Sequence, residues 1–258
     1  MNLLITLRSF SKNSFIPIFI NRTIFIVIFI SALQLSSAQQ TDAYQLKAVS
    51  AMKKVMMGTD FSAHIKWDTL PKANLFALAP MNRLQGEVTI IDGKMHASQV
   101  DKDRQVTLRH DYNVKSPFAV YTHVNHWESY ETKLSTNKVS DIQKFIEKIA
   151  KDKGYDLDKP FPFRIKGDFD QLKYHIISMP KGQKKHNHQL HQQAKEFFDL
   201  QNEKGELLGF YSRQHQGIFT HKGQLIHVHF VDDEEKNAGH LDGLSTEDTT
   251  VEVLVPAP

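Results

Sequence analysis

The chain has 258 residues, of which 32 are basic and 29 acidic, and it contains no cysteine. This near balance of charge gives no reason to expect a nucleic-acid partner. The absence of cysteine excludes disulfides and thiolate ligands, so a metal ion in this protein would be held by nitrogen and oxygen atoms alone.

The first 38 residues have the pattern of a secretory signal peptide. They contain three basic residues and no acidic residue. An apolar run covers residues 23–33, and the small residues of 36–38 follow it. This order predicts cleavage after Ala38 and export to the periplasm or the medium. The alternative is a membrane anchor over 15–33, but Pro17 and Arg22 interrupt that run. We therefore expect no membrane span after cleavage, and a mature chain with 29 basic and 29 acidic residues.

The first half of the expected mature chain is predicted to be rich in strands. Apolar residues at helical spacing predict one helix over 44–57, which Gly58 ends. Asp92-Gly93 is a two-residue hairpin signal between alternating segments. The expected strands cover residues 74–78, 86–91, 94–99, 106–109 and 118–124.

A boundary is predicted near residue 158. Before it, Ser140 and Gln143 have the spacing of a capping box at the start of a helix, and Gly154 ends that helix. After it, Pro160-Phe161-Pro162 breaks any continuing helix or central strand. We therefore expect a β-rich N-terminal subdomain over 39–158 and a β-rich C-terminal subdomain over 159–258.

In the second half, strands are expected over 163–166, 172–179, 207–212 and 218–220, with a short helix ending near Leu200. Strands dominate and helices are few, so the fold class is α+β. A polar stretch from Lys181 carries His186, His188 and His191. These histidines suggest a second, exposed metal site, but their polar surroundings favour a solvated loop.

One histidine-containing stretch carries the strongest chemical signal. Between residues 225 and 230, apolar residues alternate with His227 and His229, which is the period of a strand. The acidic run over 232–235 predicts a loop, after which Gly239 allows His240 to return beside the pair. Three converging imidazoles form a zinc site with one coordination position left open. The alternative is a strand with two solvated histidines.

This stretch resembles the metal motif of the acetolactate decarboxylases, including the gap between the second and third histidines. The similarity covers roughly residues 45–250. Four further blocks resemble the family in the same order: Leu84-Gln85-Gly86-Glu87 with Asp92-Gly93, Ser116-Pro117-Phe118-Ala119, Phe163 to Phe169, and Gly205 to Phe210.

The resemblance implies zinc-dependent decarboxylation of 2-acetolactate, a 2-hydroxy-3-keto acid, to acetoin. It implies Zn²⁺ on His227, His229 and His240, and two subdomains built on mixed or antiparallel sheets with the metal between them. Glu87 stands at the family's glutamate position and is expected to handle the proton. His175 aligns with the family's active-site arginine and is expected to be catalytic. A homodimer is left open.

The chain departs from the family pattern at three places. Ala79-Pro80 replaces the usual Gly-Thr, and His175 replaces an arginine that would bind a carboxylate through two bonds. The family's second glutamate lies in a longer C-terminal tail, and neither Glu247 nor Glu252 matches it by motif. His215 and His221 are either supporting groups of the site or solvated residues.

Two other functions fit these departures. One is a lyase or isomerase acting on a related 2-hydroxy-3-keto acid. The other is a secreted homologue that binds a metal or ligand without catalysis. Acetoin formation by the purified protein would separate the decarboxylase from both alternatives.

Overall fold

The structure of the protein, a computed structural model, describes residues 44–183 and 185–257. These described residues all belong to one compact unit. The expected signal peptide and the cleavage site after Ala38 lie outside the described residues. Within the described ranges, no helix has the length and apolar character needed to cross a membrane.

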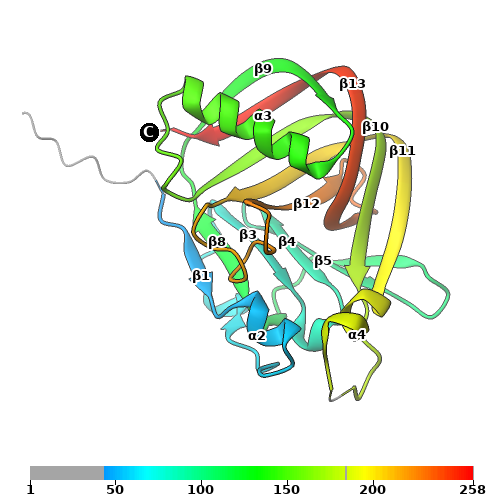
Figure 1. Ribbon diagram of the computed structural model, residues 1–258. Helices are drawn as coiled ribbons and strands as arrows, with labels where there is room; N and C mark the ends of the chain where they lie inside the picture. The colour runs from blue at the N-terminus through cyan, green and yellow to red at the C-terminus, as the bar shows by residue number, and fades with distance from the viewer. Residues whose placement is uncertain (1–43, 184, 258) are drawn as a thin grey trace, which may run out of the picture. The chain divides into compact units, whose positions relative to one another are not determined.

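The first sheet has six antiparallel strands in the order β1–β8–β3–β4–β5–β6 (Figure 1). Helix α2 (Met52–Met56) follows the first of these strands, and the short pair β2 (Ile65–Lys66) and β7 (Lys115–Ser116) forms a separate ribbon. The strand bounds are β1 Lys47–Val49, β3 Leu75–Pro80, β4 Glu87–Ile91, β5 Lys94–Val100, β6 Val106–Arg109 and β8 Ala119–His123.

The second sheet has five strands in the order β10–β11–β12–β13–β9, and β13 also pairs with β10. The sheet therefore closes on itself through β10, β11, β12 and β13. Two helices accompany it, α3 (Val139–Asp152) and α4 (His188–Gln193). The strand bounds are β9 Trp127–Thr136, β10 Phe161–Ile177, β11 Lys195–Tyr211, β12 Ile226–Asp232 and β13 Ala238–Pro256.

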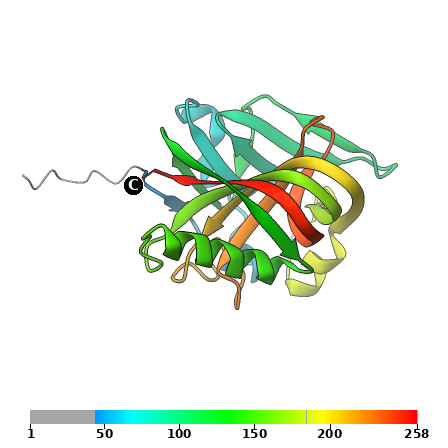
Figure 2. The same cartoon turned by 90° about the horizontal axis from the view of Figure 1, so that it is seen from above.

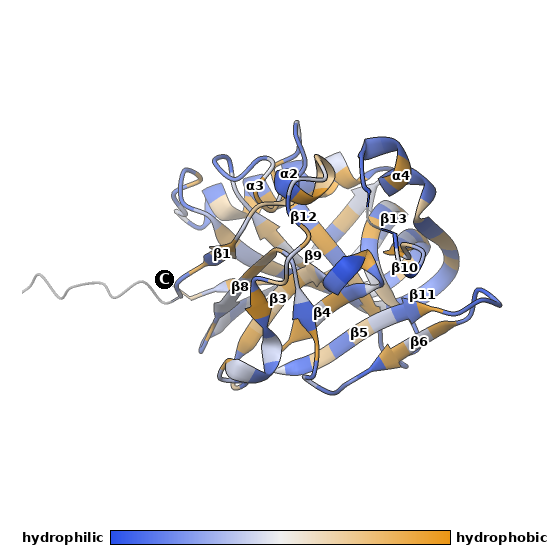
Figure 3. Cartoon of the chain, turned by 90° about the horizontal axis from the view of Figure 1, so that it is seen from below, coloured by the Kyte–Doolittle hydropathy of each residue, from blue (hydrophilic) through white to orange (hydrophobic). Residues whose placement is uncertain are grey.

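Apolar side chains hold the two sheets and α3 together. Helix α3 lies along the second sheet (Figure 2) and buries Ile142, Ile146 and Ala150 in the largest hydrophobic cluster. Another cluster joins Phe76 of β3 to Phe210 of β11, and thus the first sheet to the second. In Figure 3 the strands carry most of the apolar residues, whereas α4 is largely hydrophilic. The two sheets thus face each other across a shared interior.

The α+β prediction is confirmed, because the described chain consists mainly of antiparallel strands with few helices. The hairpin signal is also confirmed, since Asp92 and Gly93 both have positive φ, 49° and 73°, between β4 and β5. Two-residue hairpins of this kind require positive φ at both positions, and aspartate and glycine tolerate it. Strand β6 has the predicted bounds.

Two predicted helices differ from the structure. The helix expected over 44–57 exists only as α2, because residues 47–49 pair with β8 as strand β1. The predicted capping box at Ser140 is wrong: the N-cap of α3 is Lys138, two residues earlier, and it makes no side-chain cap. Gly154, with φ +79°, follows the C-cap of α3 as predicted.

The strands of the second half are longer than predicted. The two expected runs are one strand, β10, because β11 pairs with residues on both sides of Asp170, although the pairing with β13 shifts register between Gly167 and Gln171. Helix α4 ends at Gln193, and residues 195–200 belong to β11. Residues 218–220 form a turn in which Phe219 and Thr220 donate backbone N–H groups to the His215 carbonyl.

The change from one sheet to the other comes between β8 and β9, at residues 124–126. This point is earlier than the boundary expected near residue 158, because β9 pairs with β13 and α3 packs on the second sheet. Pro162 lies inside β10, where only β11 pairs with the strand. The division into subdomains over 39–158 and 159–258 stays a prediction.

Candidate metal and active site

Strand β12 carries two of the three predicted metal ligands. All seven of its residues are buried, including His227 and His229. The predicted strand is present, and the burial of both histidines rules out the alternative of two solvated side chains. Buried imidazoles need polar partners, so the position of these two rings already suggests a polar site inside the protein.

Strand register brings further histidines beside this pair. His240 lies directly opposite His229 in the pairing of β12 with β13, and His175 of β10 lies directly opposite His240. Residues directly opposite each other on antiparallel strands place their side chains on the same face. Three adjacent strands therefore present His229, His240 and His175 in one row, and His227 lies two residues along β12 on the same face.

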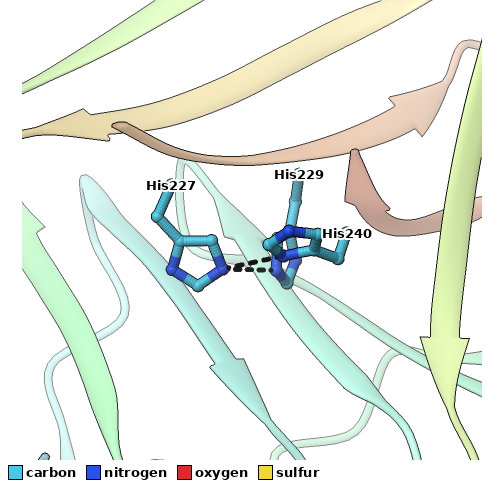
Figure 4. A group of neighbouring side chains, drawn as sticks. All are labelled: His227, His229 and His240. Atoms are coloured by element: carbon cyan, nitrogen blue, oxygen red, sulfur yellow. Dashed lines mark hydrogen bonds between the residues drawn. The ribbon is translucent and has the colours of Figure 1, made fainter. Parts of the chain in front are cut away.

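The ring nitrogens of the three predicted ligands point toward one another (Figure 4). His227 Nε2 lies 3.1 Å from His240 Nδ1 and 3.2 Å from His229 Nε2. Nitrogens bound tetrahedrally to one zinc ion at 2.0–2.1 Å would lie about 3.3 Å apart. The observed spacing is therefore close to that of a metal site.

Burial keeps these imidazoles neutral. It lowers the pKa of His227 to about 3, and it lowers the pKa values of His229 and His240 well below the usual range, with the neighbouring histidines adding to the effect. A neutral imidazole offers a lone pair, which is the form that binds a metal ion. The three rings could therefore hold a cation.

A threonine from the first sheet supports one of these rings. Thr89 of β4 is buried, and its Oγ1 lies 2.8 Å from His229 Nδ1. When Nδ1 carries the proton and donates it to this hydroxyl, Nε2 keeps its lone pair for a metal. Histidine ligands commonly have such a partner, which fixes both the tautomer and the ring orientation.

Glu87, the predicted acid or base, lies beside the same ring. Its Oε2 is 4.0 Å from His229 Nε2, and its Oε1 accepts a long hydrogen bond, 3.4 Å, from the backbone N–H of Ile177. Burial raises the pKa of Glu87 well above its usual range, although the Ile177 bond opposes this. The preceding Gly86 has φ +141° and approaches the Ser98 carbonyl, so a side chain there would clash. The carboxyl group is thus suited to carry a proton.

His175, the second predicted catalytic residue, is buried next to His240, with ring centroids 4.7 Å apart. Its Nδ1 lies 2.5 Å from Asp242 Oδ2, and Lys195 Nζ lies 3.8 Å from the other carboxylate oxygen. Burial lowers the pKa of His175, while Asp242 acts in the opposite direction. Asp242 holds the ring in a defined orientation, an arrangement that motif spacing could not predict.

A pocket opens beside these residues. Its polar lining includes Glu87, His175, His227 and His240, and its apolar wall includes Met52 and Val55 of α2 together with Pro80, Leu84, Phe118 and Ile177. The apolar spacing that predicted a helix over 44–57 gave no signal that its residues face the site. Pro80, one of the departures from the family pattern, is part of this wall.

Two further histidines, His191 and His221, line the pocket. The His221 ring centroid is 5.7 Å from that of His240, and burial lowers the pKa values of His221 and His191 to about 4 and about 3. His215 instead stacks on Phe219 and lies within hydrogen-bond distance of the Ser212 hydroxyl. His221 is therefore placed at the site, and His215 supports a turn.

The other candidate residues lie elsewhere. The His186 ring contacts Phe61 and His191. Within the described residues, however, His186, His188 and His191 do not bring three ligand atoms together. Glu252 accepts a hydrogen bond from Ser129 and lies 3.6 Å from Lys166, and the backbone of Glu247 bonds Asp170. Neither glutamate lines the pocket.

The family profile and the sequence relatives of this chain are all alpha-acetolactate decarboxylases. The alpha-acetolactate decarboxylase family profile matches residues 44–256. The chain is 25% identical over 224 residues to the alpha-acetolactate decarboxylase of Brevibacillus brevis, a match covering 86% of this chain and 73% of the relative. It is 23% identical over 233 residues to the enzyme of the same name from Bacillus subtilis, covering 86% and 84%.

Solved structures share the fold. The crystal structure of alpha-acetolactate decarboxylase from Bacillus subtilis has a TM-score of 0.64 at 20% identity, covering 83% of this chain and 86% of that one. A Staphylococcus aureus protein described as of unknown function and similar to this enzyme has a TM-score of 0.62 at 19% identity, covering 81% and 85%. Since the family profile covers most of the sequence, the chain belongs to the alpha-acetolactate decarboxylase family, whose members are carboxy-lyases.

Proposed function

We propose that this chain decarboxylates 2-acetolactate to acetoin at a zinc ion held by His227, His229 and His240. The observation that carries the proposal is the convergence of three neutral ring nitrogens at the edge of a pocket, where His227 Nε2 lies 3.1 Å from the nitrogen of His240 and 3.2 Å from that of His229. Family membership supports the reaction, and the geometry supports the place where it would occur.

The donor set fits zinc. Imidazole nitrogen suits zinc, copper, iron and nickel, and three histidines leave a coordination position for a substrate oxygen. Neutral ligands also leave the full charge of the ion in place, whereas thiolates would partly cancel it. A bound zinc ion would supply a Lewis acid that stabilises negative charge on substrate oxygens as CO₂ leaves.

Glu87 is proposed to deliver the proton that replaces CO₂. Burial raises the pKa of Glu87 and so favours its protonated form, and its Oε2 lies 4.0 Å from the metal-facing nitrogen of His229. The carbon atom that loses CO₂ needs one proton to become acetoin, and a positioned carboxylic acid can donate it. Solvent would then restore the proton to Glu87.

His175 is proposed to position the carboxylate end of the substrate. Asp242 accepts a hydrogen bond from Nδ1–H, so Nε2 can donate to a carboxylate only when the ring is protonated, the form that Asp242 favours. The His175 ring lines the pocket and lies beside His240, so a substrate bound to the zinc ion would lie close to this ring. The apolar wall formed by α2 and Phe118 would contact the methyl groups of acetolactate and limit the access of water.

Purified protein incubated with racemic 2-acetolactate tests the proposal. We expect acetoin and CO₂ in equal amounts, loss of activity after chelation, and recovery on adding zinc. Zinc binding without acetoin formation would contradict the proposed reaction. Full activity in the chelated protein would contradict the proposed role of the metal.

A further inference from the structure

A second group of potential ligands lies where the turn between β12 and β13 meets the first sheet. His96 of β5, His110 directly after β6, and Glu235 in the turn between β12 and β13 bring one ligand atom each within 4.8 Å of one another. None of them belongs to the site described above. We propose that His96, His110 and Glu235 form a second divalent-cation site that ties the β12–β13 turn to the first sheet.

His96 is the clearest sign of a missing ligand. It is 3% exposed, and neither of its ring nitrogens has a hydrogen-bond partner. Buried polar groups are nearly always paired, so a buried imidazole with two free nitrogens needs an explanation. Its Nε2 lies 3.7 Å from Glu235 Oε1, too far for a hydrogen bond but near the spacing of two ligands of one ion, about 3.3 Å.

His110 is already oriented for metal binding. Its Nδ1 lies 2.7 Å from the Met95 carbonyl oxygen and must donate a proton to it, because a carbonyl only accepts. In a neutral ring this leaves the lone pair on Nε2, which is 4.0 Å from Glu235 Oε2. A backbone carbonyl on the far nitrogen is the usual support of a histidine ligand.

Glu235 supplies the charge. Its backbone has φ +54°, a left-handed conformation that is uncommon outside glycine, asparagine and aspartate. The turn holds this conformation through hydrogen bonds from the backbone N–H groups of Glu235 and Lys236 to Asp232. The carboxylate is thereby held against His96 and His110. Lys94 pairs with the same carboxylate and would compete with a cation for it.

The donors indicate the class of ion. Two imidazole nitrogens and one carboxylate suit zinc, cobalt or nickel and disfavour magnesium and calcium, which prefer oxygen ligands. His110 and Glu235 are partly exposed, so water can complete the coordination. The site would be structural, because the turn that holds Glu235 joins the strand of His229 to the strand of His240.

Zinc titration of the full-length chain, first freed of metal, tests this inference. We expect two equivalents per chain in wild type and one in Glu235→Gln and in His110→Ala, with acetoin formation kept in zinc-saturated samples. Glu234→Gln and His123→Ala are matched controls, because Glu234 pairs with Lys236 and His123 bonds the Pro71 carbonyl. Both controls should bind two equivalents.

Two further variants separate this site from the proposed catalytic one. The His227→Ala variant should still bind the zinc ion at His96, His110 and Glu235. The double variant His227→Ala with Glu235→Gln should bind no zinc. Lys94→Met should tighten the second equivalent severalfold, because the competing ammonium group is gone. One equivalent in wild type, or a second equivalent that survives both Glu235→Gln and His110→Ala, would overturn the inference.

Discussion

Burial sets the charge state of the individual side chains at the pocket. The same loss of water that lowers the pKa values of His227, His229 and His240 raises the pKa of Glu87. Burial therefore favours three neutral imidazoles with free lone pairs and one protonated carboxyl group side by side. A metal-assisted decarboxylation needs this combination, because the ion requires neutral imidazoles and the product requires a proton.

Glu87→Gln tests the proton donor. The substitution keeps the shape of the side chain and removes its acidic proton, so turnover should fall about 100-fold or more. The zinc content should stay at the wild-type level, because Glu87 is not one of the three proposed ligands. Glu131→Gln on the exposed face of β9 is the control and should leave the rate unchanged. Wild-type turnover in Glu87→Gln would exclude the proposed role.

His175→Ala and Asp242→Asn test the positioning of the substrate carboxylate. Both should raise KM more than they lower kcat, and Asp242→Asn should act less strongly because the histidine ring remains. His175→Arg should restore binding, since arginine donates two hydrogen bonds to a carboxylate. If KM is unchanged in all three variants, the substrate carboxylate lies elsewhere in the pocket.

At the scale of the elements, the register of three strands assembles the site. His229, His240 and His175 are direct neighbours across β12, β13 and β10. Gly239 allows this close approach, because a Cβ atom there would lie 2.6 Å from the His175 carbonyl oxygen and 2.7 Å from Tyr174 Cδ2. The glycine before the third histidine thus serves packing between β13 and β10.

Gly239→Ala should therefore separate β13 from β10. We expect a loss of about 1–3 kcal/mol in the free energy of unfolding, as for other overpacked positions, together with weaker zinc binding. Gly243→Ala on the same strand is the matched control, because its nearest contact would be Lys173 Cβ at an ordinary 3.5 Å. Equal unfolding midpoints for the two variants would contradict this account of Gly239.

Local patterns predicted the short elements better than the long ones. Asp92-Gly93 and the alternation around His227 and His229 depend on neighbours in sequence, and the structure confirms both elements. Strand β10 continues through polar residues that sequence suggested were a break, because β11 provides partners along nearly its whole length. Strand β1 was missed because its pairing with β8 depends on residues about 70 positions away.

At the scale of the whole molecule, the pocket combines side chains from both sheets and from α2. The spacing of the histidines and the family resemblance pointed to five residues that the structure places together. The partners Thr89 and Asp242 could not be predicted, because only tertiary packing brings them near the motif, and only the structure places His221 at the site instead of in solvent. No local signal marks such contacts in a single sequence.

Export remains a prediction from the first 38 residues. The basic, apolar and small-residue order predicts that the mature protein begins at Gln39. N-terminal sequencing of protein recovered from the producing cells and their medium would check this. An intact Met1 on material that stays inside the cells would contradict it.

We propose that His227, His229 and His240 hold the zinc ion at which acetolactate is decarboxylated. The most direct test determines zinc content and acetoin formation on the same samples of wild type and His229→Ala, with His123→Ala as a control histidine. Because the second site proposed above would also hold zinc, His110→Ala serves as the background for each protein. We predict about one zinc per chain and acetoin formation in that background, and loss of both when His229→Ala is added. Zinc and activity that persist without His229 would contradict the account.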